Sequence, residues 1–219
     1  MQLTIREPGS AITHFIACLM ALMAASPLMI KAQGNTTNML AMAVFAGSMI
    51  LLYGASTAYH SISRVSDKVL RIFRKIDHMM IFVLIAGSYT PVCLIVLGGR
   101  MGYSLLALVW GTALVGMIVK ACWITCPKWF SSVLYITMGW LCVLAFVPIF
   151  HALPRAGFDW LLAGGIIYTI GGVIYALKVP LFDARHKNFG SHEIFHVFIM
   201  LGSACHFVVM YFFVAPLPV

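Results

Sequence analysis

Charged residues divide the chain into long apolar runs. No Asp, Glu, Lys or Arg lies between residues 31 and 64, 77 and 100, 100 and 120, 128 and 155, or 159 and 178, and none follows residue 193. About 20 apolar residues cross a bilayer as an α-helix. The runs therefore predict seven transmembrane helices near residues 12–31, 38–61, 76–97, 103–122, 131–151, 160–178 and 192–214. Uninterrupted runs of this length favour an all-α bundle over a membrane barrel.

The composition supports a membrane protein. Hydrophobic residues make up 62% of the 219 residues, charged residues make up 9%, and the mean hydropathy is +0.99. These values exclude an ordinary soluble domain. We expect a single seven-helix transmembrane domain over residues 1–219. Its first helix stays uncleaved, because its apolar run is long and six more helices follow.

The basic residues predict an orientation. Eleven of the 14 Lys and Arg residues lie in the N-terminal tail or in the loops after the second, fourth and sixth spans: Arg6, Arg64, Lys68, Arg71, Arg74, Lys75, Lys120, Lys128, Lys178, Arg185 and Lys187. The positive-inside rule then places the N-terminus in the cytoplasm and the C-terminus outside. Because these residues sit in short loops without an aromatic platform, we expect no nucleic-acid binding.

Small residues and cysteines carry two further expectations. Gly47 and Gly54, and likewise Gly164 and Gly171, recur seven residues apart, which predicts close helix approach at both pairs. The six cysteines show no CxxC spacing, so we expect free thiols. Cys122 and Cys126 would share a helix face. We expect their side chains to pack there rather than bind a metal.

Polar residues from three predicted helices converge at one membrane depth. His192 and His196 are four residues apart and project from one face of the last helix. His60 lies at the end of the second helix, one turn after Ser56. Asp77 opens the third helix. All of these positions fall on the predicted cytoplasmic side.

Three neutral imidazoles with one open position are typical of a catalytic zinc site. Coordination would offset the free-energy cost of burying His60, His192 and His196. Asp77 would hold the metal-bound water or orient a ligand imidazole, and Ser56 would hydrogen-bond to that water or to an oxyanion. The HxxxH spacing also arises by chance. Histidines that snorkel or hydrogen-bond across helices therefore remain the alternative.

Four motifs resemble the hemolysin III proteins, the bacterial branch of the progestin and adiponectin receptor family. They are SxxxH at 56–60, Asp77-His78, AGSYTP at 86–91 and SHEIFH at 191–196, with Glu7 and Thr13-His14 at the first span. The resemblance covers essentially the whole chain. It implies a seven-helix protein of the bacterial inner (cytoplasmic) membrane, with zinc near the cytoplasmic helix ends.

The same resemblance implies zinc ligands at His60, His192 and His196, with Asp77 holding a zinc-bound water and Ser56 nearby. The chain departs from the family at two positions. It has Ser10 where bacterial relatives usually have Asn, and Phe82 where they usually have Tyr. Both changes remove a polar group, so we do not expect substrate or activity to carry over unchanged.

Other polar residues receive subsidiary roles. His14 and Glu7 are candidates for contacting the metal ligands. His206, about 15 Å deeper along the last helix, would line a cavity beneath the metal or form a cross-helix hydrogen bond. His78 is expected to face a neighbouring helix or lipid headgroups, and Glu193 to face loop cations.

Four functions are compatible with these residues. The first is a zinc-dependent hydrolase that acts on the ester or amide bond of a membrane lipid, or that maintains membrane lipid homeostasis. The alternatives are a non-catalytic membrane sensor or regulator with structural zinc, a pore-forming cytolysin, and a haem-binding electron carrier. Membrane lipids are the expected partners. The sequence identifies no protein partner, oligomeric state or substrate.

Overall fold

The computed structural model describes residues 5–177 and 190–218. Within these ranges, seven helical segments are long and apolar enough to cross a membrane, which confirms the predicted bundle. They are α1 (Pro8–Lys31), α2 (Thr36–Ser61), α3 (Asp67–Pro91) with η1 (Val92–Leu97), α4 (Gly99–Cys122), α5 (Lys128–Gly139) with η2 (Trp140–Ala145) and α6 (Phe146–Ala152), α7 (Arg155–Leu177), and α8 (Ser191–Val209) with η3 (Met210–Val214).

The third helix begins at Asp67, whereas the apolar pattern predicted a start near residue 76. The Ser66 hydroxyl accepts a hydrogen bond from the Val69 N–H and caps the helix. Asp67 lies in the first turn, where a carboxylate is favourable to the helix dipole. The charged residues after position 67 therefore form helical turns before the apolar stretch begins, rather than a loop.

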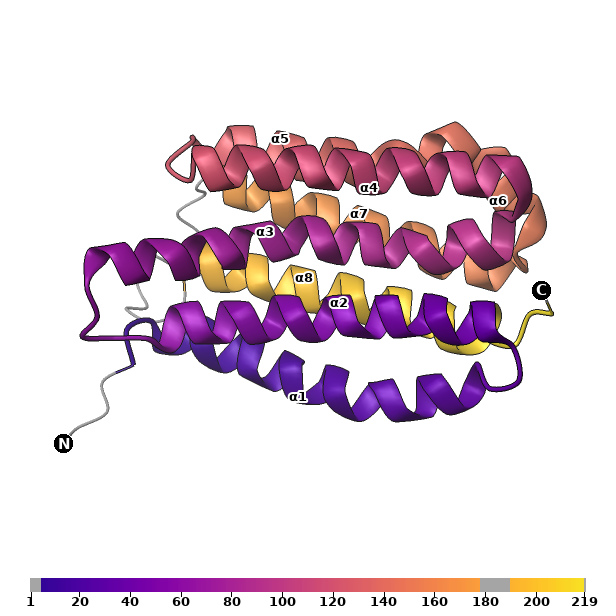
Figure 1. Cartoon of the computed structure of the whole chain (residues 1–219), viewed down its shortest axis with the longest axis horizontal. Coiled ribbons are helices and arrows are strands. Elements are labelled where there is room, and N and C mark those ends of the chain that lie inside the picture. Colours follow the sequence, from indigo (N-terminus) through magenta and orange to yellow (C-terminus); the bar gives the residue numbers. More distant parts are fainter. Residues whose placement is uncertain (1–4, 178–189, 219) are drawn as a thin grey trace.

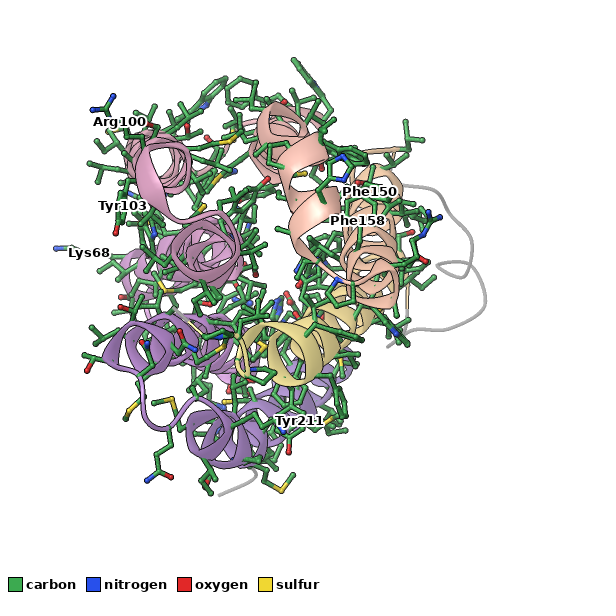
Figure 2. The ribbon with its side chains drawn as sticks, turned by 90° about the vertical axis from the view of Figure 1, so that its right-hand side faces the viewer. Lys68, Arg100, Tyr103, Phe150, Phe158 and Tyr211 are labelled. Atoms are coloured by element: carbon green, nitrogen blue, oxygen red, sulfur yellow. The ribbon has the colours of Figure 1, made fainter. Side chains whose placement is uncertain are left out.

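Successive transmembrane segments run antiparallel along the long axis of the molecule (Figure 1). Contacts link neighbours in the order α1, α2, α3, α4, α5, α7 and α8, and α8 returns to α1, so the bundle closes into a ring. Seen from the end at which the C-terminus lies, the side chains of Lys68, Arg100 and Tyr103 point away from this ring (Figure 2).

The ends of the helices agree with the predicted alternation of loops. The start of α1 and the α2–α3 and α4–α5 connections lie at one end of the bundle, and the C-terminus lies at the other (Figure 1). The predicted loop cations Lys178, Arg185 and Lys187 fall outside the described residues. The assignment of one end to the cytoplasm remains a prediction from loop charge.

The fifth span is interrupted near its middle, and a tyrosine from α3 bridges the interruption. The hydroxyl of Tyr89 donates a hydrogen bond to the Gly139 carbonyl (2.6 Å) and accepts one from the Cys142 N–H (2.7 Å). In a membrane, a broken helix is tolerated where its freed backbone groups find partners inside the protein. Tyr89 supplies those partners.

Only one of the two predicted glycine contacts is present. A Cβ on Gly164 would lie 2.4 Å from His206 Cδ2, and one on Gly171 would lie 2.7 Å from Phe198 Cβ, so α7 and α8 need both glycines to pack. The prediction is wrong for the other pair. A Cβ on Gly47 would meet no atom within 4 Å, and one on Gly54 would make an ordinary contact of 3.8 Å.

The α4–α5 junction corrects two expectations. Helix α4 ends at Cys122, so Cys126 lies in the following loop rather than on the same helix face. Lys120, expected in a loop, lies in the last turn of α4 and is only 1% exposed. All six cysteines are free thiols, as predicted.

Substitution of Tyr89 by Phe should destabilise the bundle, because it leaves the Gly139 carbonyl and the Cys142 N–H without their partner. A buried unpaired polar group costs about 1–3 kcal/mol. We expect a lower midpoint of thermal unfolding in detergent. Tyr103→Phe is the matched control, because Tyr103 is 61% exposed. Equal midpoints for the two variants would show that Tyr89 does not stabilise the break.

Candidate metal centre

Three imidazoles meet at one end of the bundle. His60 is in the last turn of α2, and His192 and His196 are in the first two turns of α8. One nitrogen from each ring lies within 4.8 Å of the other two. The Nε2 atoms of His60 and His192 are 3.4 Å apart. This spacing allows the three residues to hold a metal ion.

Glu7 fixes the orientation of His60. Glu7 is the residue before α1, and its carboxylate accepts a hydrogen bond from His60 Nδ1. Its backbone N–H also donates to the His60 carbonyl at 3.1 Å. The hydrogen bond with His60 holds the pKa of the Glu7 carboxyl below its usual value, despite partial burial. With the proton of His60 on Nδ1, the Nε2 lone pair is left for a cation.

Thr13 plays the corresponding part for His196. Its hydroxyl donates to the carbonyls of Gly9 and Ser10, both at 3.0 Å. Its oxygen is therefore left to accept from His196 Nδ1, at 3.2 Å. The Nε2 atom of His196 then carries the lone pair. A hydrogen bond to the second ring nitrogen is the usual way in which proteins orient a metal-binding histidine.

The third imidazole, His192, has no hydrogen bond within the described part of the chain that orients its ring through Nδ1. The Nδ1 atom of His192 is buried and has no hydrogen-bond partner among the described residues. Without an ion, the short contact between His60 and His192 would be a hydrogen bond between the two Nε2 atoms. A cation between the rings would instead allow both lone pairs to point inward.

Asp77 and Ser56 lie beside the imidazoles on the wall of one cavity. Asp77 is 7% exposed and Ser56 is 1% exposed. An Asp77 carboxylate oxygen lies 2.9 Å from His78 Nδ1. His78, expected to face a neighbouring helix or headgroups, lines the cavity, and its carbonyl accepts a hydrogen bond from the Tyr135 hydroxyl of α5 at 3.2 Å. The Ser56 hydroxyl has no hydrogen-bond partner within the described ranges.

His14 packs directly on the cluster. Its ring stacks on His196 with centroids 3.6 Å apart and planes 8° from parallel. The Tyr53 ring also packs against the His14 ring, in a T-shaped arrangement with the centroids 5.1 Å apart. Neither ring nitrogen of His14 has a partner in the part of the chain that the structure describes. His14 thus contacts His196, a candidate ligand. Glu7 and Thr13 hydrogen-bond to the Nδ1 atoms of His60 and His196.

The cavity has a volume of about 180 Å³ and continues from the imidazoles into the apolar bundle. His192 and His196 of α8 line it. Ile149 of α6 and Phe158 and Leu161 of α7 line it as well. The cavity therefore joins a polar cluster to a hydrocarbon-like interior.

His206 lies on the wall of this cavity, deeper along α8. Its Nε2–H donates to the Leu161 carbonyl of α7 at 3.3 Å, and the Tyr168 ring lies edge-on at 5.2 Å. Both features considered for His206, the cavity lining and the cross-helix hydrogen bond, are thus present together.

The two departures from the family pattern have different surroundings. The Ser10 hydroxyl donates to the Glu193 carboxylate, which also accepts from the Gly190 N–H at 2.8 Å. Ser10 therefore keeps a polar contact one residue away from His192. Phe82 is 1% exposed and packs against Tyr135, with centroids 4.7 Å apart. The loop cations expected near Glu193 lie outside the described residues.

Thr13 is the functional candidate that sequence reasoning gave no role. Its spacing from any histidine along the chain carries no signal, because the contact joins residues 183 positions apart. The Thr13-His14 pair was visible as a polar dipeptide in an apolar helix. Only the packing of α1 against α8 shows that the threonine, rather than the histidine, bonds to His196.

Comparison with known proteins agrees with this architecture. A family model described as Haemolysin-III related matches residues 3–207. The chain is 38% identical to Hemolysin-3 of Bacillus cereus, over 96% of this chain and 92% of that protein. It is also 38% identical to the Hemolysin-3 homolog of Bacillus subtilis (strain 168), over 98% of each chain. The adiponectin receptor protein of Drosophila melanogaster is 27% identical over 92% of this chain and 49% of its own length. The chain is a multi-pass membrane protein that belongs to the haemolysin-III related family.

Proposed function

We propose that this protein binds zinc through His60, His192 and His196 and hydrolyses the ester or amide bond of a membrane lipid. One observation carries the proposal. Two residues of the three-imidazole cluster, His192 and His196, line an apolar cavity whose wall also bears Asp77. Candidate metal ligands, a carboxylate and an apolar space suited to acyl chains therefore lie together.

The residues present fit a zinc ion. Three neutral nitrogen donors and an open fourth position are the usual ligand set of catalytic zinc. Glu7 and Thr13 occupy the second nitrogen of two of the rings, which orients those rings toward the common centre. A bound cation would also offset the cost of burying three imidazoles in an apolar bundle.

Each neighbouring group has a chemical role. When bound, zinc would acidify a water molecule and polarise the lipid carbonyl. Asp77 would accept the proton of the attacking water and return it to the leaving amine or alcohol. Ser56, whose hydroxyl is free of other partners among the described residues, would donate to the developing oxyanion. His78 would hold the Asp77 carboxylate in place.

A non-catalytic role is the second candidate. Glu7 and Thr13 tie α1 to α2 and α8 at the imidazoles. Zinc at this junction would hold three helices together, as in a membrane sensor or regulator. Pore formation and haem binding remain further alternatives. Dye leakage from liposomes that contain the protein would reveal a pore, and a Soret band would reveal haem.

Replacement of Thr13 by Val should weaken zinc binding while leaving the ligands intact. Loss of a hydrogen bond to a metal-bound histidine lowers metal affinity about 10–100-fold. Competition with a chelator of known affinity measures this change. Thr112→Val is the matched control, because Thr112 is half-buried on α4 and its hydroxyl donates to the Leu108 carbonyl. An unchanged affinity for Thr13→Val would remove the proposed role of Thr13.

Replacement of Asp77 by Asn should abolish lipid hydrolysis and keep bound zinc. Loss of a general acid–base group lowers turnover about 10²–10⁴-fold. Mass spectrometry of lipids incubated with purified protein measures turnover, and metal analysis measures zinc. Asp159→Asn is the control, since Asp159 pairs with Arg155 at the surface of α7. Turnover by Asp77→Asn at the wild-type rate would overturn the mechanism. No turnover by the zinc-loaded wild type would favour the non-catalytic role.

A further inference from the structure

Lys120 is a buried cation away from the imidazole cluster. It lies in the last turn of α4 and is 1% exposed. Its Nζ atom is 3.1 Å from the sulfur of Cys126 and also donates to the Ser131 hydroxyl. The Tyr135 ring lies 5.9 Å from the same nitrogen. Lysine is almost never fully buried unless it is paired, so this arrangement needs a partner for its charge.

No carboxylate in the described part of the chain forms an ion pair with Lys120. Of the groups that contact Nζ, a hydroxyl and an aromatic ring remain neutral in their ordinary state. The sulfur of Cys126 is the group in contact that can carry a full negative charge. The Lys120 ammonium and the Cys126 sulfur are therefore the pair whose charges can offset one another.

The loop after α4 holds Cys126 in this position. The Cys126 N–H donates to the Trp123 carbonyl at 3.4 Å, which closes a turn between α4 and α5. The Ser131 hydroxyl lies 3.4 Å from the same sulfur. Cys126 is 7% exposed, so a small reagent can approach it more readily than a bulky one. A cysteine sulfur beside a lysine is the environment in which thiols become nucleophilic.

We propose that Lys120 stabilises negative charge on the Cys126 sulfur and makes Cys126 a reactive thiol, a modification site for small electrophiles and peroxides. With iodoacetamide, the sulfur forms a bond to carbon and the carbon–iodine bond breaks, releasing iodide. With hydrogen peroxide, the thiolate attacks one oxygen and the O–O bond breaks. Cysteine is oxidised to the sulfenic acid, and the leaving hydroxide takes a proton to become water.

Cys122 provides an internal comparison. It is exposed at the end of α4, two residues after Lys120, and no lysine contacts it in the described ranges. Accessibility alone would make Cys122 the faster of the two thiols. Activation by Lys120 would instead favour Cys126, although it is buried.

The test uses the full chain in detergent, with Cys122→Ala so that Cys126 is followed alone. Mass spectrometry follows the iodoacetamide adduct on Cys126 with time, in folded protein and in denaturant. We expect the folded protein to react faster than the unfolded one, because burial without activation can only slow the reaction. Lys120→Met, which keeps the apolar stem, should slow the folded reaction about tenfold or more.

Two controls make the result specific. Lys68→Met removes a lysine of α3 that points away from the bundle and should leave the Cys126 rate unchanged (Figure 2). Cys126→Ala reports Cys122, whose rate should not respond to Lys120→Met. A Cys126 rate no faster in folded than in unfolded protein would overturn the proposal, and so would an unchanged rate in folded Lys120→Met. If Lys120→Met fails to fold, the comparison of folded with unfolded protein decides alone.

Discussion

A helix bundle that faces hydrocarbon has no bulk water inside to satisfy its polar groups, so each buried imidazole needs a protein partner or an ion. Glu7 and Thr13, at the start of α1, bond to the Nδ1 atoms of His60 and His196. The candidate ligands themselves come from α2 and α8. Because α1 contacts both of these helices, the cluster is complete only when the first and last spans close the ring.

The cavity extends from this cluster into the apolar interior of the bundle. At one end its wall carries imidazoles, Asp77 and Ser56, and beyond them it is lined largely by apolar side chains. A lipid would place its polar bond at the first end and its acyl chain at the second. The interrupted fifth span borders the apolar part, where Tyr89 supplies the hydrogen bonds that the backbone lacks. The fold thus places a polar cluster beside an apolar cavity, and Tyr89 pairs with two of the backbone groups at the break.

Much of the fold follows from the sequence, because bilayer thickness fixes the length of an apolar run and charge marks its ends. Helical periodicity and span boundaries also brought His60 and the α8 histidines to one depth. Side-chain partners across helices were not accessible in this way. The bond from Thr13 to His196, the contact of His78 with Asp77 and the burial of Lys120 depend on helix rotation and packing. A hydropathy pattern leaves both undetermined.

The central claim is that three imidazoles from two helices share one zinc ion. X-ray absorption at the zinc edge of the purified wild-type protein, with His192→Ala beside it, tests this claim most directly. The account predicts a tetrahedral site with three imidazole nitrogens and one oxygen, and loss of an imidazole signal or of zinc in the variant. Absence of zinc from the wild type, or coordination through cysteine sulfur, would contradict it.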